Sequence, residues 1–179
     1  MKVNVFARSA VIILIGVTGA SQTIPEWKLF TSNTGFSVMY PGSWFDVGGS
    51  GDRLDILSSP ERTSGVVILE GQAEIIVLED KKDGSLSQFI DEYNRSATVL
   101  SRKHIANSRA ASCASFEEVV ARIEVGAERY IISTGYFCAL NRRKFVTLVN
   151  NWEGDPQQAS WQAVAVTVAK SLRLPEEFP

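Results

Sequence analysis

The chain has 179 residues, of which 45% are hydrophobic and 21% are charged, and its formal net charge is −2. Apolar residues are spread along the whole chain, which predicts a folded protein and argues against disorder. The mild acidity argues against nucleic-acid binding by counterion release, because that mode of binding needs a basic face.

The start of the chain has the composition of a cleavable secretory signal peptide. Lys2 and Arg8 form a basic segment, residues 10–17 are apolar, and residues 18–20 are small. We expect cleavage after residue 20 or 21. A permanent membrane anchor is the less favoured alternative, because the uncharged stretch is shorter than the roughly 20 apolar residues that a spanning helix needs.

Residues 1–20 are therefore predicted to be a signal peptide, and residues 21–179 a single domain of the periplasm or the extracellular space. Removal of the leader leaves sixteen lysines and arginines against twenty acids, a net charge of −4. No cysteine lies near the cleavage site, which excludes a lipid anchor on cysteine. We expect no membrane anchor after cleavage.

The first part of the mature chain is predicted to be rich in strands. Alternating apolar and polar residues predict strands at Trp27–Thr31 and Phe36–Tyr40. Pro41 ends the second strand because proline has no amide hydrogen for the ladder. Two further strands are predicted at Leu54–Leu57 and at Val66–Leu78, the latter interrupted near Gly71.

A short helix is predicted after these strands. Ser85 is a good helix N-cap, and the apolar residues behind it recur at helical spacing. The residues on this face are Leu86, Phe89, Ile90 and Tyr93. A strand over Val99–Ile105 is expected to follow.

Three consecutive antiparallel strands are predicted to form a meander, at Phe116–Ile123, Arg129–Phe137 and Lys144–Asn150. A turn centred on Val125-Gly126 would pair residues whose numbers sum to 251. The pairs would be Ile123 with Glu128, Ala121 with Tyr130, and Val119 with Ile132. Asn141-Arg142 is predicted to form the next turn.

A second helix is predicted near the C-terminal end of the sequence. Asp155 at the N-cap and Pro156 at the first helical position are start signals. The apolar stripe consists of Trp161, Val164, Ala165, Val168 and Leu172, and the helix is expected to end near Pro175. Such a helix should pack on the sheet, so the predicted class is α+β, an antiparallel meander flanked by helices.

Cys113 and Cys138 are the only cysteines, and their numbers also sum to 251. The predicted pairing places them opposite each other on neighbouring strands, within reach of a disulfide. Oxidation is expected in an exported protein. Two buried free thiols are the alternative, and the pairing could also slip by one residue. No Cys-x-x-Cys spacing suggests a redox role.

The sequence predicts no enzyme, no metal and no cofactor. The single histidine, His104, has Arg102 and Lys103 as neighbours, which disfavour the imidazolium that a catalytic triad forms. The acidic run at residues 79–84 lacks EF-hand spacing and is interpreted as a solvated turn. Glu117 and Glu118 are adjacent in a strand and should point to opposite faces. A hydrolase that uses only carboxylates stays open as a minor alternative.

Three aromatic residues next to the Pro-Gly break are candidates for a partner or ligand patch. They are Tyr40, Trp44 and Phe45. Trp44 and Phe45 are neighbours, so in an extended chain only one of them can join such a patch. The favoured alternative is that one or both fill the core at a strand end. Asn94-Arg95-Ser96 matches a glycosylation triplet, and its use is left open.

Residues 35–44, Gly-Phe-Ser-Val-Met-Tyr-Pro-Gly-Ser-Trp, resemble the PsbP-like family, whose members often have a strand ending in Tyr-Pro followed by a small-residue turn and Trp. The helix after Ser85 and the closing helix ending at residues 170–173 agree with this resemblance. It implies a PsbP-like α/β sandwich, a central antiparallel sheet with helices on its faces. It also implies a binding or accessory role, because the family includes extrinsic photosystem II subunits and nuclear-transport cofactors. A photosynthetic role is not expected, since the leader is secretory. No partner-contact or metal residue of the family can be matched here.

The sequence therefore predicts an exported, non-enzymatic accessory domain that binds another envelope or secreted protein. The alternative is a carrier of a small apolar ligand, with a pocket between the sheet and the C-terminal helix. Trp161 and Tyr130 would line that pocket.

Overall fold

The computed structural model describes residues 26–48, 51–61, 68–107 and 113–175. The predicted signal peptide lies outside these residues, as do residues 66 and 67 of a predicted strand. In the described part of the chain, no helix is long and apolar enough to span a membrane.

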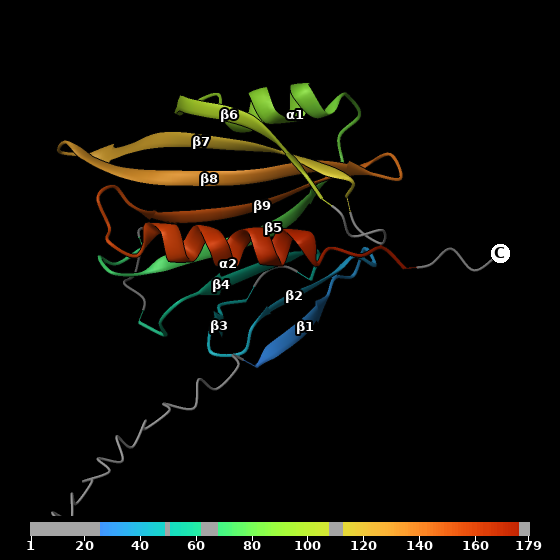
Figure 1. Cartoon of the computed structure of the whole chain (residues 1–179), viewed down its shortest axis with the longest axis horizontal. Helices are drawn as coiled ribbons and strands as arrows, with labels where there is room; N and C mark the ends of the chain where they lie inside the picture. Colours follow the sequence, from blue (N-terminus) through green and yellow to red (C-terminus); the bar gives the residue numbers. More distant parts are fainter. Residues whose placement is uncertain (1–25, 49–50, 62–67, 108–112, 176–179) are drawn as a thin grey trace, which may run out of the picture.

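The described residues form a seven-stranded antiparallel sheet, a two-stranded hairpin and two helices (Figure 1). In spatial order the large sheet contains β3 (Phe45–Asp46), β4 (Arg53–Leu57), β5 (Ala73–Asp80), β9 (Arg143–Trp152), β8 (Arg129–Leu140), β7 (Ser115–Gly126) and β6 (Thr98–Ala106). The hairpin is β1 (Trp27–Thr31) with β2 (Ser37–Pro41), and the helices are α1 (Leu86–Tyr93) and α2 (Gln158–Lys170). The α+β class and the β7-β8-β9 meander are confirmed.

The two helices cover opposite faces of the large sheet. Side chains alternate along a strand, so Ile75 and Val77 of β5 pack with α2, whereas Ile76 packs with α1. On the α2 side, the predicted stripe residues Trp161, Ala165 and Val168 are buried in the core. Figure 1 shows α2 in front of the sheet, beside β9 and across β5. The domain is thus an α/β sandwich with a core on each face of the sheet.

The N-terminal hairpin joins the domain through the segment that follows α2. Ser37 and Arg173 exchange two backbone hydrogen bonds of 2.9 Å each. The Met39 N–H also donates to Ser171 Oγ at 2.8 Å. The predicted strand at Trp27–Thr31 has the observed bounds.

One helix start was predicted correctly and one helix was predicted too long. Ser85 caps α1, and a capping box joins it to Gln88. Asp155 caps only a turn before α2: its Oδ1 accepts the Gln157 N–H at 2.8 Å, and the helix begins at Gln158. The helix ends at Lys170, five residues before Pro175, because the chain turns there to pair with Ser37. The interruption predicted near Gly71 in the strand at Val66–Leu78 is present as a turn with Gly71 at φ 74°, and the strand after it, β5, runs from Ala73 to Asp80.

The predicted pairing between β7 and β8 was wrong by three residues. Ala121 pairs with Ser133, not with Tyr130, and Val119 pairs with Gly135, not with Ile132. Likewise Ile123 pairs with Ile131, not with Glu128. The turn is formed by Ala127 and Glu128, at φ 46° and 59°, and the ladder has an irregularity between Glu124 and Gly126. β7 therefore continues through the predicted turn to Gly126, whereas β8 begins at Arg129, as predicted.

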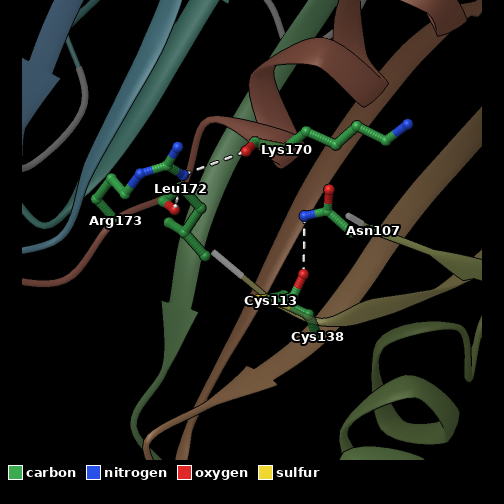
Figure 2. The surroundings of a disulfide bond; sticks show 6 residues. All are labelled: Asn107, Cys113, Cys138, Lys170, Leu172 and Arg173. Atoms are coloured by element: carbon green, nitrogen blue, oxygen red, sulfur yellow. Dashed lines mark hydrogen bonds between the residues drawn. A yellow bond between two sulfur atoms is a disulfide. The ribbon is translucent and has the colours of Figure 1, made fainter. Parts of the chain in front are cut away.

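The predicted disulfide between Cys113 and Cys138 is confirmed, although the pairing used to predict it was wrong (Figure 2). Cys113 lies two residues before β7, so the cysteines are not partners in the ladder. Their Cα atoms are 6.1 Å apart, and both residues are buried. Asn107 holds the connection between β6 and β7 by donating to the Cys113 carbonyl at 2.8 Å. The bridge is a structural part of the α2-side core.

Candidate binding site at one end of the sheet

A cavity of about 460 Å³ lies at one end of the large sheet. Three connections form it: the β4–β5 loop, the β7–β8 turn and the β9–α2 loop. Figure 1 shows the β7–β8 turn and the β9–α2 loop at the same end of the sheet. The lining residues are Glu70, Gly71, Glu128, Arg129, Tyr130, Trp152, Glu153, Gly154, Asp155, Pro156 and Gln157. Loops on a rigid sheet often carry binding residues, which makes this end the candidate site.

The β7–β8 turn places Glu128 at the cavity. Gly126 pairs with Arg129, so Ala127 and Glu128 are the two turn residues, and both have positive φ. This backbone follows the twist of an antiparallel hairpin, but it normally takes Asn and Gly. A side chain on left-handed backbone costs about 1 kcal/mol. Glu128 therefore holds its position at an energetic cost.

The β4–β5 loop is fixed by a buried glutamine. Gln72 Oε1 accepts the Leu69 N–H at 3.0 Å, and its Nε2 donates to the Ser59 and Glu61 carbonyls at 3.1 and 2.9 Å. Gln72 is 3% exposed, so this arrangement is held in the interior. It sets the backbone that carries Glu70 into the cavity.

Two arginines cover the two aromatic rings of the cavity. The Arg129 guanidinium carbon lies 4.1 Å from the Trp152 ring centroid, and its Nη2 lies 2.8 Å from Glu70 Oε1. The Arg122 guanidinium carbon, next to the cavity, lies 3.6 Å from the Tyr130 ring centroid. Arg122 Nη2 also lies 3.0 Å from Glu153 Oε2. Each guanidinium is thus held between one ring and one carboxylate.

The pocket expected between the sheet and the C-terminal helix is not where the cavity lies. Trp161 packs into the α2-side core at 5% exposure and does not line the cavity, whereas Tyr130 does line it. The cavity lies before the N-terminus of α2, and its lining places four carboxylates and Arg129 beside the Trp152 and Tyr130 rings. Charged groups at the walls of a cavity do not favour an apolar ligand.

The three aromatic residues of the predicted patch lie near one another in the chain but differ in exposure. Phe45 is 43% exposed in β3, the edge strand of the sheet. Tyr40 and Trp44 are half-buried and pack against the α2-side core. Phe45 is therefore the residue of the three that offers most of its ring to a partner.

The remaining chemical candidates form ion pairs. His104, on the exposed strand β6, has its Nδ1 atom 3.1 Å from Glu117 Oε1 on β7. The hydrogen bond between them is the main cause that lowers the pKa of Glu117. Glu118 points to the other face and pairs with Lys103 at 2.7 Å, as predicted for adjacent strand residues. In the acidic run, Asp80 pairs with Lys144 at 2.9 Å. Over the described ranges, no group of three or more His, Cys, Asp or Glu side chains could hold a metal ion.

Asn94 of the glycosylation triplet lies at the C-cap of α1, where its Nδ2 donates to the Ile90 carbonyl at 2.8 Å. That amide nitrogen is the atom a glycan would use. The triplet therefore has a structural role at the end of the helix.

Sequence reasoning missed the residues of the cavity, with the exception of Tyr130. The sequence pattern predicts a strand pair for Glu128 and a helix cap for Asp155, and it indicates no functional role for Glu70 and Trp152. A local signal was present in two of the three connections, where an acid is next to a glycine or proline, as in Glu70-Gly71 and Asp155-Pro156. Nothing in the sequence showed that these connections, far apart in the chain, meet in space.

No protein-family model matches the chain, and no curated protein sequence matches it. Solved structures do match. The solution structure of cyanobacterial PsbP from Synechocystis has a TM-score of 0.51 and 15% identity, and the match covers 90% of this chain and 99% of that one. The yeast Ran-binding protein Mog1p, from Saccharomyces cerevisiae, has a TM-score of 0.50 and 12% identity, with 84% and 96% coverage.

A crystal structure from Bacteroides thetaiotaomicron also matches, with a TM-score of 0.51 and 14% identity. That match covers 83% of this chain, which spans about half of the other chain's length, 48%. At these identities the comparisons concern the fold alone. The resemblance seen in residues 35–44 is confirmed at that level: the chain has a PsbP-like α+β fold, shared with PsbP and Mog1p.

Proposed function

We propose that this protein is an exported, non-enzymatic accessory domain that binds another envelope or secreted protein. Its fold is that of PsbP and of a Ran-binding protein, which supports a binding or accessory role. The buried Cys113–Cys138 disulfide suits an oxidising compartment outside the cytoplasm. The signal-like composition of residues 1–20 supports the same location.

The observation that carries this proposal is the cavity at the end of the sheet. Its walls come from three loops held by the sheet, by the Gln72 hydrogen bonds and by the two arginine–ring contacts. A preformed surface of this kind loses little conformational entropy when a partner binds. We therefore expect the partner to bind at this end of the molecule.

The experiment is co-purification of the partner from the envelope and secreted fractions of the cells that make the protein. Gln157 is exposed at the cavity, so Gln157→Trp should fill its mouth and reduce recovery of a partner that wild-type protein retains. Ser87→Trp on the exposed side of α1 is the control, and it should leave recovery unchanged.

Phe45→Ala tests the aromatic residues as a rival docking surface. Full loss of the partner with Phe45→Ala and none with Gln157→Trp would move the binding surface to β3. Recovery of no specific partner at low salt by wild-type protein would contradict the proposed function itself.

A further inference from the structure

The cavity has an excess of negative charge. Four carboxylates line it, those of Glu70, Glu128, Glu153 and Asp155, and Arg129 is the one cationic side chain in the lining. With neighbouring Arg122 included, two cations face four anions. The field of such a concave surface attracts cations and repels anions.

Two of the four carboxylates are not neutralised within the described part of the chain. Glu128 has no ion pair there, and Asp155 Oδ1 accepts only the backbone N–H of Gln157, at 2.8 Å. Glu70 and Glu153 are paired with Arg129 and Arg122. The unbalanced charge therefore lies on the β7–β8 turn and on the β9–α2 loop, on two sides of the cavity.

The protein's own arginines show which chemistry these walls accept. Arg129 is held by Trp152 and Glu70, and Arg122 by Tyr130 and Glu153. A ring face together with a carboxylate is a favourable setting for a guanidinium, which is weakly hydrated and planar. A further cationic side chain entering the cavity would meet the two carboxylates that remain.

The geometry points to a basic peptide segment as the occupant of this cavity: arginine or lysine side chains of the partner bind between Glu128 and Asp155. This inference rests on the proposed function and specifies the partner's chemistry. A volume of about 460 Å³ is within the range of sites that hold a whole ligand group, so it has room for more than a single ion. Charge complementarity favours a basic segment over an acidic peptide or a nucleic acid.

The test is a titration of the isotope-labelled protein with the peptide Ac-Gly-Arg-Gly-Arg-Gly-Arg-amide, followed by NMR. Amide shifts should concentrate in residues 126–130 and 152–157, and binding should weaken as salt rises to about 0.3 M. Glu128→Gln and Asp155→Asn should each weaken binding about two- to fivefold. Asn keeps an oxygen that can accept the Gln157 N–H, so the turn before α2 is preserved.

Asp83→Asn is the matched control, because it removes the same charge at an exposed position in the β5–α1 connection, at the other end of the sheet. It should leave the affinity unchanged. Equal weakening by Asp83→Asn, shifts centred elsewhere, or equal binding of the corresponding glutamate peptide would overturn the inference. Argininamide alone binding as tightly as the peptide would also overturn it, because a segment should gain from several contacts.

The two proposals fail in different ways. Suppose that the partner is lost with Gln157→Trp but is still recovered with Glu128→Gln and Asp155→Asn. That result would support the proposed function and contradict the inference that the partner binds through a basic segment. Peptide binding at the cavity without a recoverable partner would support the charge chemistry and contradict the accessory function.

Discussion

Arg129 lies across the face of Trp152, with its guanidinium carbon 4.1 Å from the ring centroid. The ring itself is fixed, because Trp152 Nε1 donates to the Ile68 carbonyl at 2.7 Å. Arg129 Nη2 completes the contact by pairing with Glu70 at 2.8 Å. This relationship joins the start of β8, the end of β9 and the β4–β5 loop, so Arg129 both builds the cavity and reduces its negative charge.

Arg129→Gln should therefore affect stability and binding in opposite directions. Loss of the ring contact and of an exposed ion pair should lower the free energy of unfolding by about 1 kcal/mol. The cavity would become more acidic, and the arginine peptide should bind about two- to fivefold more tightly. Urea unfolding and peptide titration measure the two effects. Weaker peptide binding by a folded variant would show that Arg129 does not act through its charge.

Glu128→Gly should stabilise the protein and weaken binding. Glycine removes the cost of a side chain on left-handed backbone, for a gain of about 0.5–1 kcal/mol. Arg142 gives a matched control: it occupies the β8–β9 turn at φ 65°, at the opposite end of the sheet. Arg142→Gly should give a similar gain in urea unfolding with unchanged peptide affinity. Equal peptide affinity for Glu128→Gly and wild type would show that Glu128 is not part of the binding site.

The same turn shows why the sheet was easier to predict than its pairing. β-branched and aromatic runs identified all three strands of the meander, because that preference is local. The pairing depends on where the chain reverses, and the sequence pattern favoured Gly126. The chain reverses instead at Ala127 and Glu128, with an irregularity next to Gly126. A turn built from two unfavourable residues leaves no sequence signal.

Removal of the disulfide should cost roughly 3 kcal/mol of unfolding free energy, because the bridge closes a loop with a sequence separation of 25. The double substitution Cys113→Ala with Cys138→Ala is preferred, since both positions are buried and serine would bury a hydroxyl. Urea unfolding of the wild type and the double variant measures the loss. Two reactive thiols in the unreduced, denatured wild-type protein would contradict the bridge.

Glu79 should stabilise the fold at neutral pH and not in acid. The hydrogen bonds from Arg143 are the main cause that lowers the pKa of Glu79, outweighing burial, and Arg143 also donates to the Thr34 carbonyl at 3.0 Å. A carboxyl whose pKa is lowered in the folded state stabilises the fold at pH values above its unfolded pKa of about 4.3. This stabilisation is lost as the pH falls through the pKa of the folded state. Glu79→Gln should lower the unfolding free energy at pH 7 by about 1–2 kcal/mol, and the difference should vanish near pH 2. A constant difference across that range would assign the effect to packing.

Glu74 should show the reverse dependence. Burial is the main cause that raises its pKa, and Asp55 on the neighbouring strand adds to the rise, while Asn150 donates to its carboxylate at 2.9 Å. The folded state then binds the proton more tightly, so the wild type loses stability as the pH rises from about 4.3 through the raised value. Glu74→Gln, which keeps an acceptor for Asn150, should be more stable at pH 7 by roughly 0.5–1 kcal/mol and gain nothing near pH 4. An equal gain at both pH values would contradict this origin.

The candidate site could not be predicted from the sequence, for a physical reason. Glu70, Glu128 and Asp155 belong to three different connections, and they share a cavity only because β5, β8 and β9 are neighbours in the sheet. The order of strands in space is set by long-range packing, which a local pattern does not contain. The disulfide was predicted correctly from a wrong pairing because Cys113 and Cys138 lie close together in the fold, with Cα atoms 6.1 Å apart, without being partners in the ladder.

The most direct test of the central claim, that a partner binds at the cavity end of the sheet, is site-specific photocrosslinking in the cells that make the protein. A photoreactive amino acid replaces Gln157 at the cavity or Asp83 at the opposite end. We predict one dominant adduct from position 157, reduced by excess arginine peptide, and none from position 83. Adducts from position 83 alone, or equal adducts from both positions, would contradict the claim.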